Sequence, residues 1–160
     1  MSETLITQDY IDHFSQTPSM YSSCANDQDT PETTRVLGGW SELDSNIIHF
    51  AVETTQSERF ISFAEVGNRV SLVSVTLSNY LTYQYKGEII SIEPTSPKDL
   101  EKVQAYIDGF CNLVAYVGID SDRYKVGFAG SSYTIISFKV DSVFDQTPRV
   151  GAGALVKSLK

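Results

Sequence analysis

The residues best suited to chemistry lie in the segment "ETTQSER", residues 53–59, which separates an apolar run from the next apolar pattern. Here hydroxyl groups and one guanidinium meet the predicted start of a helix at Ser57. Backbone N–H groups in the first turn of a helix have no acceptor within it, and with the positive end of its dipole they bind oxyanions. Arg59 would add a bidentate, charge-assisted hydrogen bond. The segment indicates a phosphate site; the alternative is that Ser57 only caps the helix while Arg59 pairs with a surface carboxylate.

Arg35 is a second cation that fits this chemistry. It is the first basic residue of the chain and precedes the segment on a predicted strand, at a spacing that a hairpin could bring alongside. The formal net charge of the chain is −8, and no stripe of Lys and Arg offsets it. Such a field repels nucleic acid and anionic lipid, so we expect neither nucleic acid nor membrane as a partner. A small anionic ligand is still expected where local cations overcome the overall field.

Other chemistries have little to draw on. His13 and His49 are the only histidines, and His49 falls within an apolar strand, so neither a metal-ligand set nor a Ser-His-Asp set is expected. Cys24 and Cys111 lie far apart, have no metal-ligand spacing and are expected to be small core residues. The stretch "GAGALV", residues 151–156, lacks a complete dinucleotide fingerprint and is expected to belong to a flexible tail. The sequence therefore leaves the catalytic residues unknown and predicts no metal ligand.

The length and composition are those of one folded domain. The chain has 160 residues, of which 41% are hydrophobic, which is enough to bury a core. We expect a single domain over residues 1–160, with the N-terminal helix in 1–19 and the tail in 145–160 at its periphery. The sequence shows neither a signal-peptide pattern nor an apolar run of membrane-spanning length. With two cysteines, the sequence predicts a protein of the reducing cytoplasm.

Hydrophobic periodicity predicts three helices and a series of strands. Helices are expected at 7–16, from Ser57 to Gly67, and at 96–117, where Ser96 and Asp99 form a pattern like a capping box. Strands are expected at residues 19–27, 33–40, 47–52, 70–79, 81–94, 122–130 and 133–144. A pair of glycines inside the second strand indicates a bulge or a close backbone approach. Helices that interrupt a mostly antiparallel run of strands favour a mainly β fold, a β-barrel with appended helices.

The order and spacing of these elements resemble the pyridoxamine 5′-phosphate oxidase-like, FMN-binding split-barrel family. The resemblance rests on successive stretches of this sequence: "MYSSCAND", "TPETTRVLGG", "IIHFAVETTQSER", "FISFAEVGN", "RVSLVSV" and "YLTYQYKGEI". The long helix and the final strands extend it over most of the chain. It implies a split barrel, an antiparallel barrel of Greek-key type, which binds FMN. By this resemblance Arg35, Ser57 and Arg59 would hold the FMN phosphate.

The same resemblance implies roles for five other residues. Val52, Glu53 and Thr54 would run beside the flavin and the ribityl chain, largely through backbone groups. Thr82 and Gln84 would reach a cofactor that is bound mainly by the other subunit, because this family forms homodimers with flavin sites at the interface. Glu53 stands where many relatives have Thr, which places a carboxylate near an anionic ligand.

The resemblance also implies an activity. We expect an FMN-dependent oxidoreductase that acts on a small-molecule substrate, in which the isoalloxazine carries the redox chemistry and the protein positions and tunes it. Elements associated with pyridoxal phosphate binding in the true oxidases are not found in the C-terminal tail, so vitamin B6 oxidation is not expected. Alternatives are a flavin- or haem-binding storage module without turnover, and a relative that binds a deazaflavin or no cofactor. Haem is disfavoured, because no His lies in a recognisable C-terminal ligand segment.

Overall fold

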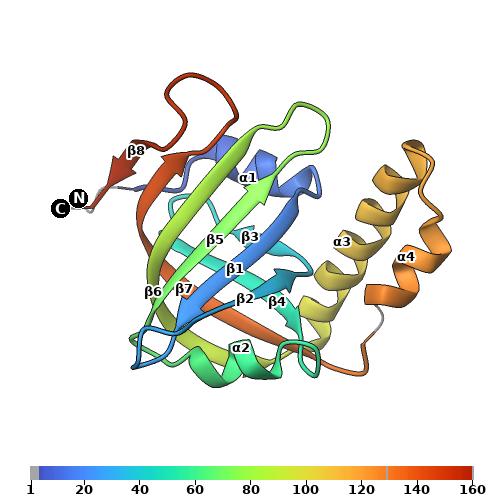
Figure 1. Cartoon of the computed structure of the whole chain (residues 1–160), viewed down its shortest axis with the longest axis horizontal. Coiled ribbons are helices and arrows are strands. Elements are labelled where there is room, and N and C mark those ends of the chain that lie inside the picture. The colour runs from blue at the N-terminus through green and yellow to red at the C-terminus, as the bar shows by residue number, and fades with distance from the viewer. Residues whose placement is uncertain (1–3, 129, 160) are drawn as a thin grey trace.

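The computed structural model describes residues 4–128 and 130–159, which form four helices and eight strands (Figure 1). The helices are α1 (Gln8–Ser15), α2 (Glu58–Phe63), α3 (Pro97–Tyr116) and α4 (Ser121–Phe128). The strands are β1 (Ser19–Ala25), β2 (Pro31–Val36), β3 (Gly39–Ser41), β4 (Ile47–Glu53), β5 (Arg69–Val75), β6 (Thr82–Pro94), β7 (Tyr133–Asp145) and β8 (Ala154–Ser158). Among these residues, no helix is both long and apolar enough to cross a membrane.

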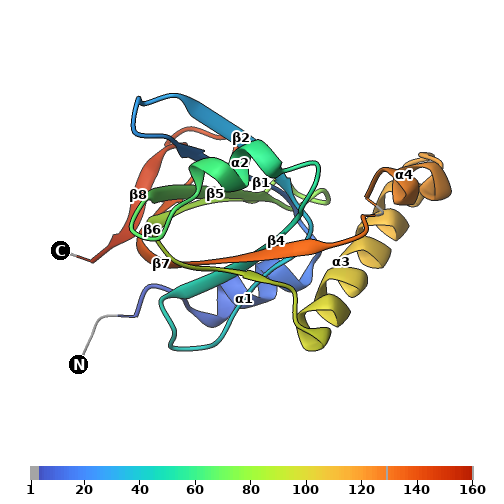
Figure 2. The same ribbon diagram turned by 90° about the horizontal axis from the view of Figure 1, so that it is seen from below.

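The strands form one antiparallel sheet that closes into a barrel. Its order is β2-β1-β5-β6-β7-β4-β3, with β8 added beside β7. The chain passes from β2 into β3 through Leu37 and Gly38, which exchange backbone hydrogen bonds with Ala51 of β4 at 2.8 and 2.9 Å. This kinked strand therefore joins the two ends of the sheet, and Figure 2 shows the resulting ring. Because β4 lies beside β7 of the β5-β6-β7 meander, the barrel contains a Greek key, and the predicted fold class is confirmed.

Alternation along the strands fills the barrel interior. In β1, Met20, Ser22 and Cys24 point inward and are buried, whereas Tyr21 points outward and is exposed. Aromatic side chains from β4, β6 and β7 complete the core, among them Phe50 and Tyr85. The period of two follows from the pleat of a strand, and it is the signal from which the sequence predicts these strands.

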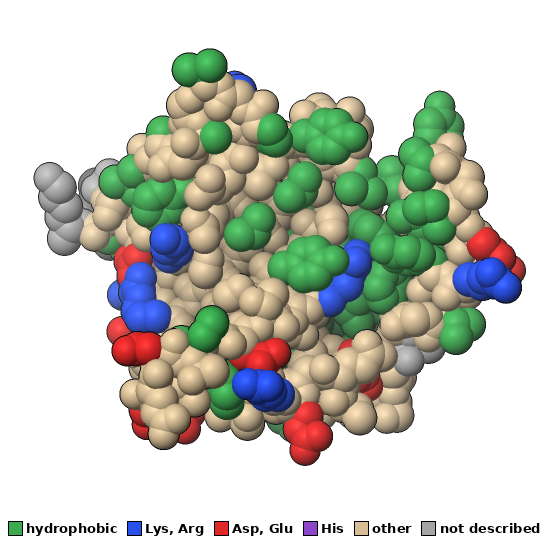
Figure 3. Space-filling view, in the orientation of Figure 1, with side chains coloured by type: hydrophobic (Ala, Val, Ile, Leu, Met, Phe, Trp, Pro, Cys, Tyr) green, Lys and Arg blue, Asp and Glu red, His purple; other side chains and the backbone are tan. Residues whose placement is uncertain are grey.

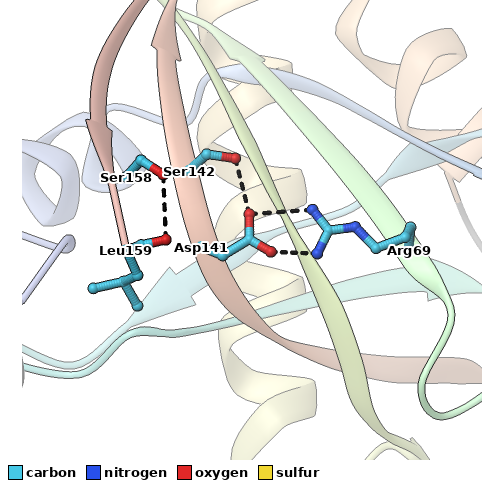
Figure 4. A network of polar contacts seen from close by, with 5 residues as sticks. All are labelled: Arg69, Asp141, Ser142, Ser158 and Leu159. Carbon is cyan, nitrogen blue, oxygen red and sulfur yellow. Dashed lines mark hydrogen bonds and ion pairs between the residues drawn. The ribbon is translucent and has the colours of Figure 1, made fainter.

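A bulge between β6 and β7 requires a glycine. The register shifts between Lys86 and Gly87, and a Cβ atom on Gly87 would lie 2.0 Å from the carbonyl oxygen of Lys139. Asp141 lies at this irregularity and accepts two hydrogen bonds from the Arg69 guanidinium of β5 (Figure 4). The Asp141 backbone carbonyl accepts from Leu159 N–H at 2.9 Å, which ties the end of the chain to the sheet. The bulge is thus fixed from both sides.

Helices α3 and α4 form a hairpin beside the barrel (Figure 1). The helix α3 begins as the sequence predicts: Ser96 Oγ accepts from Asp99 N–H at 3.1 Å and donates to the Asp99 carboxylate at 2.6 Å. The Tyr106 hydroxyl donates to the Pro18 carbonyl at 2.8 Å, and Gly38 approaches Tyr106 closely with φ +123°. The predicted close approach at the glycine pair is therefore confirmed, and it anchors α3 against the barrel.

The expected strand at residues 122–130 is wrong: residues 121–128 form helix α4, and residue 129 lies outside the described residues. Asp120 caps this helix by accepting from Asp122 N–H and Arg123 N–H. Tyr124 and Phe128 both pack on Phe110 of α3, and their own ring centroids lie 4.9 Å apart. Residues one helical turn apart can make this contact, whereas residues four apart in a strand are separated by about 13 Å. The i, i+4 spacing of these two aromatic residues was the signal for a helix.

The two terminal segments are also more ordered than expected. Leu5 and Ile6 are fully buried, so the N-terminal segment completes the core instead of lying at the periphery. The tail expected to be flexible contains β8, which pairs with β7 from Ser142 to Asp145. Its short run "ALVKS" does not alternate and follows Gly151 and Gly153, so the sequence gives little indication of a strand.

Candidate functional site

Arg35 is the centre of the candidate site. It lies on β2 directly opposite Tyr21 of β1, and its Nη1 donates to the Tyr21 hydroxyl at 3.1 Å. Aromatic rings surround its guanidinium carbon: those of Phe110 and Phe128 lie 4.8 and 4.7 Å away, and those of Tyr21 and Tyr124 lie 5.4 and 5.9 Å away. Three elements, β1, α3 and α4, therefore build a cage for one cation.

The Arg35 cation has no carboxylate partner among the described residues. The other arginines are each ion-paired: Arg59 with Glu32, Arg69 with Asp141, Arg123 with Asp120 and Arg149 with Asp145. The Arg35 atoms Nε and Nη2 are buried from solvent, and neither has a hydrogen-bond acceptor in the described structure. Shielding two donors of a guanidinium from water without giving them an acceptor is costly, so such an arrangement is kept where an external anion compensates it or where function requires it.

The Tyr106 phenol is a polar group that interacts electrostatically with this cation. Burial raises the pKa of Tyr106, and the nearby Arg35 charge acts in the opposite direction. The phenol keeps its proton and donates a hydrogen bond to the Pro18 carbonyl. A neutral phenol supplies at most a dipole to Arg35, so Tyr106 does not stand in for the carboxylate partner that Arg35 lacks among the described residues.

A polar cavity of about 260 Å³ opens beside Arg35. Its lining comes from β2, the turn after β4 and the end of α4: Thr33, Thr34, Arg35, Leu37, Glu53, Gln56, Ser57, Gly127 and Phe128. The Ser57 and Thr34 hydroxyl oxygens lie 2.6 Å apart and share a hydrogen bond. The structure thus brings Arg35, Glu53 and Ser57 of the predicted site together with two threonines of β2.

Glu53 places a carboxylate in this cavity. The side chain is buried, and its Oε2 accepts from Gln56 N–H at 2.5 Å. Gly130 lies so close that a Cβ atom there would be 2.2 Å from Glu53 Cγ. The carboxylate closes the turn of residues 53–56 and so positions Ser57, but it also takes the N–H group of Gln56 that could bind an anion. The negative charge of Glu53 also weakens the attraction that Arg35 exerts on an anion in the same cavity.

Arg59 lies outside the cavity lining. Its Nε pairs with Glu32 at 2.8 Å, its guanidinium lies over the Phe63 ring, and its side chain is 67% exposed. Ser57 is the N-cap residue of α2, but its hydroxyl makes no capping hydrogen bond and turns to Thr34 instead. The helix ends at Phe63 and not, as expected, at Gly67. The alternative in which Arg59 pairs with a surface carboxylate therefore describes its contacts.

The remaining predicted residues occupy three places. Val52 is buried in β4, and the Thr54 hydroxyl bonds that of Thr134 at 3.0 Å. Gln84 lies on β6 in the cross-strand row that runs through Val73 and Tyr21 to Arg35, three strands away. Thr82 lies on the same outer face, nearer the end of β6, and its N–H donates to the Thr147 hydroxyl. None of these four lines the cavity beside Arg35 in the described structure.

Sequence reasoning missed the aromatic cage and Thr34. The cage residues come from β1, α3 and α4, and the wrong prediction for α4 hid two of them. Thr34 immediately precedes Arg35, so a strand carrying hydroxyl groups next to a cation was a signal that could have found it.

The two histidines lie outside this cavity. Burial lowers the pKa of His13 to about 4, and its Nε2 bonds the Ser74 hydroxyl at 2.8 Å. Burial, and secondarily Lys102, lower the pKa of His49, whose Nδ1 bonds the Ser137 hydroxyl. Among the described residues no group of three His, Cys, Asp or Glu side chains could hold a metal ion.

Solved structures share this fold at low sequence identity. HupZ from Group A Streptococcus has a TM-score of 0.56 and 15% identity, over 94% of this chain and 99% of that one. A putative pyridoxamine 5′-phosphate oxidase from Lactobacillus delbrueckii has a TM-score of 0.52 and 11% identity, over 87% and 93%. An F420 reductase has a TM-score of 0.50 and 14% identity, over 86% and 98%.

These likenesses confirm the resemblance at the level of the fold. No protein-family model matches the sequence, and no curated protein matches it significantly. The order of helices and strands along the chain from α1 to β6 is the one on which the sequence resemblance rests. The chain has the split-barrel fold of the pyridoxamine 5′-phosphate oxidase-like proteins.

Proposed function

We propose that the protein binds FMN and holds the cofactor phosphate between Arg35 and Ser57. The observation that carries this proposal is the half-buried Arg35 guanidinium: its Nε and Nη2 are shielded from solvent and without an acceptor, it lines a polar cavity, and it lacks a carboxylate partner in the described structure. A phosphate would supply the missing negative charge and accept from Nε and Nη2. The fold, which FMN-binding proteins share, supports the choice of cofactor but does not by itself establish it.

The residues present fit the phosphate end of such a cofactor. Thr33, Thr34 and Ser57 supply hydroxyl groups beside the guanidinium. At about 260 Å³ the cavity is smaller than the pockets that enclose whole ligands, so it suits a phosphate group and not an entire flavin. Glu53 reduces the affinity for an anion, and we assign Arg35 the largest share of the binding.

We assign Arg59 a smaller share in this proposal. Its charge is already paired with Glu32, and a largely exposed ion pair contributes little. Val52 and Thr54 remain proposed backbone contacts of the ribityl chain. Thr82 and Gln84 remain proposed contacts of a cofactor bound by a second subunit. Gln84 lies half-buried on an outer face of the sheet, whereas Thr82, on the same face, is buried.

Bound FMN would supply electron or hydride transfer, and we propose an oxidoreductase with a small-molecule substrate. The chain's contribution is to hold the phosphate, to keep Ser57 in place through the Glu53–Gln56 hydrogen bond, and to shield Nε and Nη2 of the guanidinium from water. Such chemistry needs few acids and bases from the protein. Two buried thiols that are not paired with each other support the prediction of a reducing compartment.

A second candidate is a deazaflavin-binding protein. The F420 reductase with a TM-score of 0.50 supports this candidate, because that protein shares the barrel over nearly its whole length. A homodimer is proposed as well: the outer face of β1, β5 and β6 is not covered by a helix in Figure 1, and it carries Gln84. Sedimentation equilibrium tests the dimer directly.

The visible spectrum of the purified protein tests the cofactor. Flavin absorption bands that persist after gel filtration, or saturable quenching of added FMN, are expected. Saturable binding of F420 with no binding of FMN would select the second candidate. A protein that takes up neither would contradict the proposed function. Reduction of bound FMN by a nicotinamide donor and reoxidation with turnover would then separate an enzyme from a storage protein.

A further inference from the structure

A large apolar groove lies on the other side of Arg35. It has a volume of about 860 Å³, within the range of roughly 300–1,000 Å³ typical of small-molecule sites. One wall is the outer face of β1 with the β5–β6 turn, and the other is the C-terminal half of α3 with α4. Figure 3 shows this hollow between the barrel and the helical hairpin, with hydrophobic side chains gathered along it and a basic side chain beside them.

The groove exposes hydrophobic side chains to solvent. Tyr116 is 93% exposed and Val117 is 70% exposed, and Leu77, Tyr80 and Leu113 line the same groove and are also exposed. Scattered exposed hydrophobic residues are ordinary, but a contiguous set that lines a concave surface marks a binding site. The lining mixes aliphatic and aromatic side chains, which suits an apolar ligand body; α3 contributes Phe110, Leu113, Val114 and Tyr116, and Tyr21, Tyr80 and Tyr124 come from other elements.

Charge identifies the polar end of that ligand. Among the described residues that line the groove, Arg35 alone carries a charged side chain, although the chain contains 20 Asp and Glu. The carboxylates that would repel an anion are thus absent from this lining, while the guanidinium in it lacks a counter-ion in the described structure. A cationic or neutral apolar ligand would leave that charge uncompensated.

We propose that the groove binds an amphiphilic monoanion, an apolar chain or ring system that ends in a carboxylate, with the carboxylate at Arg35. The apolar body lies between Tyr80 of the β5–β6 turn and Leu113 and Val117 of α3. This site goes beyond FMN binding and does not need it, because the phosphate cavity and the groove have different linings and share Arg35 alone.

Isothermal titration of the full chain with laurate, dodecanol and dodecylammonium, all below their micellar concentrations, tests the proposal. These ligands have the same chain length and differ in charge. Laurate is expected to bind at least about tenfold more tightly than dodecanol, because a charge-assisted hydrogen bond is lost in the alcohol. In Arg35→Met, the affinity for laurate should fall to that for dodecanol. Equal binding of all three ligands would show non-specific hydrophobic association and would overturn the proposal.

Matched variants locate the ligand. Val117→Glu introduces a negative charge into the groove and is expected to weaken laurate binding at least about tenfold. Val126→Glu introduces the same charge at a similarly exposed position of α4 that is not part of the groove lining, and it should bind laurate as the wild type does. Equal losses in the two variants would contradict the assignment to this groove.

Two further outcomes have definite meanings. If Val117→Glu turns a dimer into a monomer while the wild type binds no laurate, a second copy of the chain covers the groove and the proposal is wrong. FMN affinity is measured for the same variants, and Val117→Glu should leave it unchanged. A wild type that binds laurate but not FMN would contradict only the proposed function, and one that binds FMN but not laurate would contradict only this inference.

Discussion

Arg35 and Glu53 line the same cavity, yet in the part of the chain that the structure describes no ion pair joins the guanidinium to the carboxylate. Each is held by other contacts: Arg35 by aromatic rings and the Tyr21 hydroxyl, and Glu53 by the N–H group of Gln56. The two opposite charges are therefore kept apart across a polar space. A ligand that enters this space meets an unsatisfied cation and a carboxylate that is already hydrogen-bonded.

Glu53→Gln is expected to tighten FMN binding. The amide oxygen of Gln can still accept from Gln56 N–H, so the turn is retained while a negative charge near the phosphate is removed. We expect roughly a fivefold gain in affinity, about 1 kcal/mol, measured by quenching of flavin fluorescence. Glu101→Gln, at an exposed position of α3, makes the same change in net charge and should leave the affinity as it is. A weaker Glu53→Gln complex would mean that the carboxylate helps to bind the cofactor.

Arg35→Met is expected to leave the fold at least as stable as the wild type. Methionine fills similar space among aromatic rings and removes a half-buried charge that has no ion-pair partner among the described residues. Urea unfolding should therefore give an equal or higher free energy of unfolding, which is the behaviour of a residue kept for binding and not for stability. A loss of more than about 1 kcal/mol would show that the cation–π contacts are structural.

Because His13 is buried, the free energy of unfolding is expected to fall in acid. Its pKa is about 4 in the folded protein and 6.5 in ordinary surroundings, because burial disfavours the charged form. The unfolded chain then binds more protons below pH 6.5, so this stabilisation is complete above pH 6.5 and is lost as the pH falls towards 4. Between about pH 7.5 and 5 the wild type should lose about 2 kcal/mol more than His13→Gln in urea unfolding. Parallel pH profiles of the two proteins would refute this assignment.

Gly87 is expected to tolerate no side chain. A Cβ atom there meets the backbone of Lys139, which cannot move without breaking the β6–β7 pairing, so Gly87→Ala should destabilise the protein by about 3 kcal/mol. Gly127→Ala is the matched control. It adds the same methyl group to α4, where no atom lies within 4 Å, and it should be neutral or stabilising by up to about 1 kcal/mol. Thermal unfolding of both variants tests the role of the bulge.

The sequence predicted most of the barrel but only part of the site. Strands β1, β4, β5, β6 and β7 alternate apolar and polar residues or are continuously apolar, and such local patterns survive in the fold. The helix α4 was mistaken for a strand because its Tyr and Val suggest a strand, whereas its packing on α3 decides for a helix.

The site depended on contacts that are distant in the chain. Arg35 and Ser57 share a cavity as the hairpin spacing suggested, and Thr34 joins them through one hydrogen bond. Nothing local in the sequence shows that Arg59 forms an ion pair with Glu32, or that the rings of Phe110 and Phe128 enclose Arg35. Tertiary packing decides which carboxylate an arginine pairs with. The sequence alone therefore could not show that Arg35, and not Arg59, is the cation left without an ion-pair partner among the described residues.

The most direct test of the central claim compares FMN with riboflavin, which lacks the phosphate, in the wild type and in Arg35→Met. Calorimetric titration should show about a tenfold to hundredfold loss of FMN affinity in the variant, from a charge-assisted contact of about 1.5–3 kcal/mol, and no change for riboflavin. Arg123→Met, which removes a charge from exposed α4, should match the wild type for both ligands. If Arg35→Met leaves FMN affinity unchanged, or lowers that of riboflavin equally, Arg35 does not hold the phosphate.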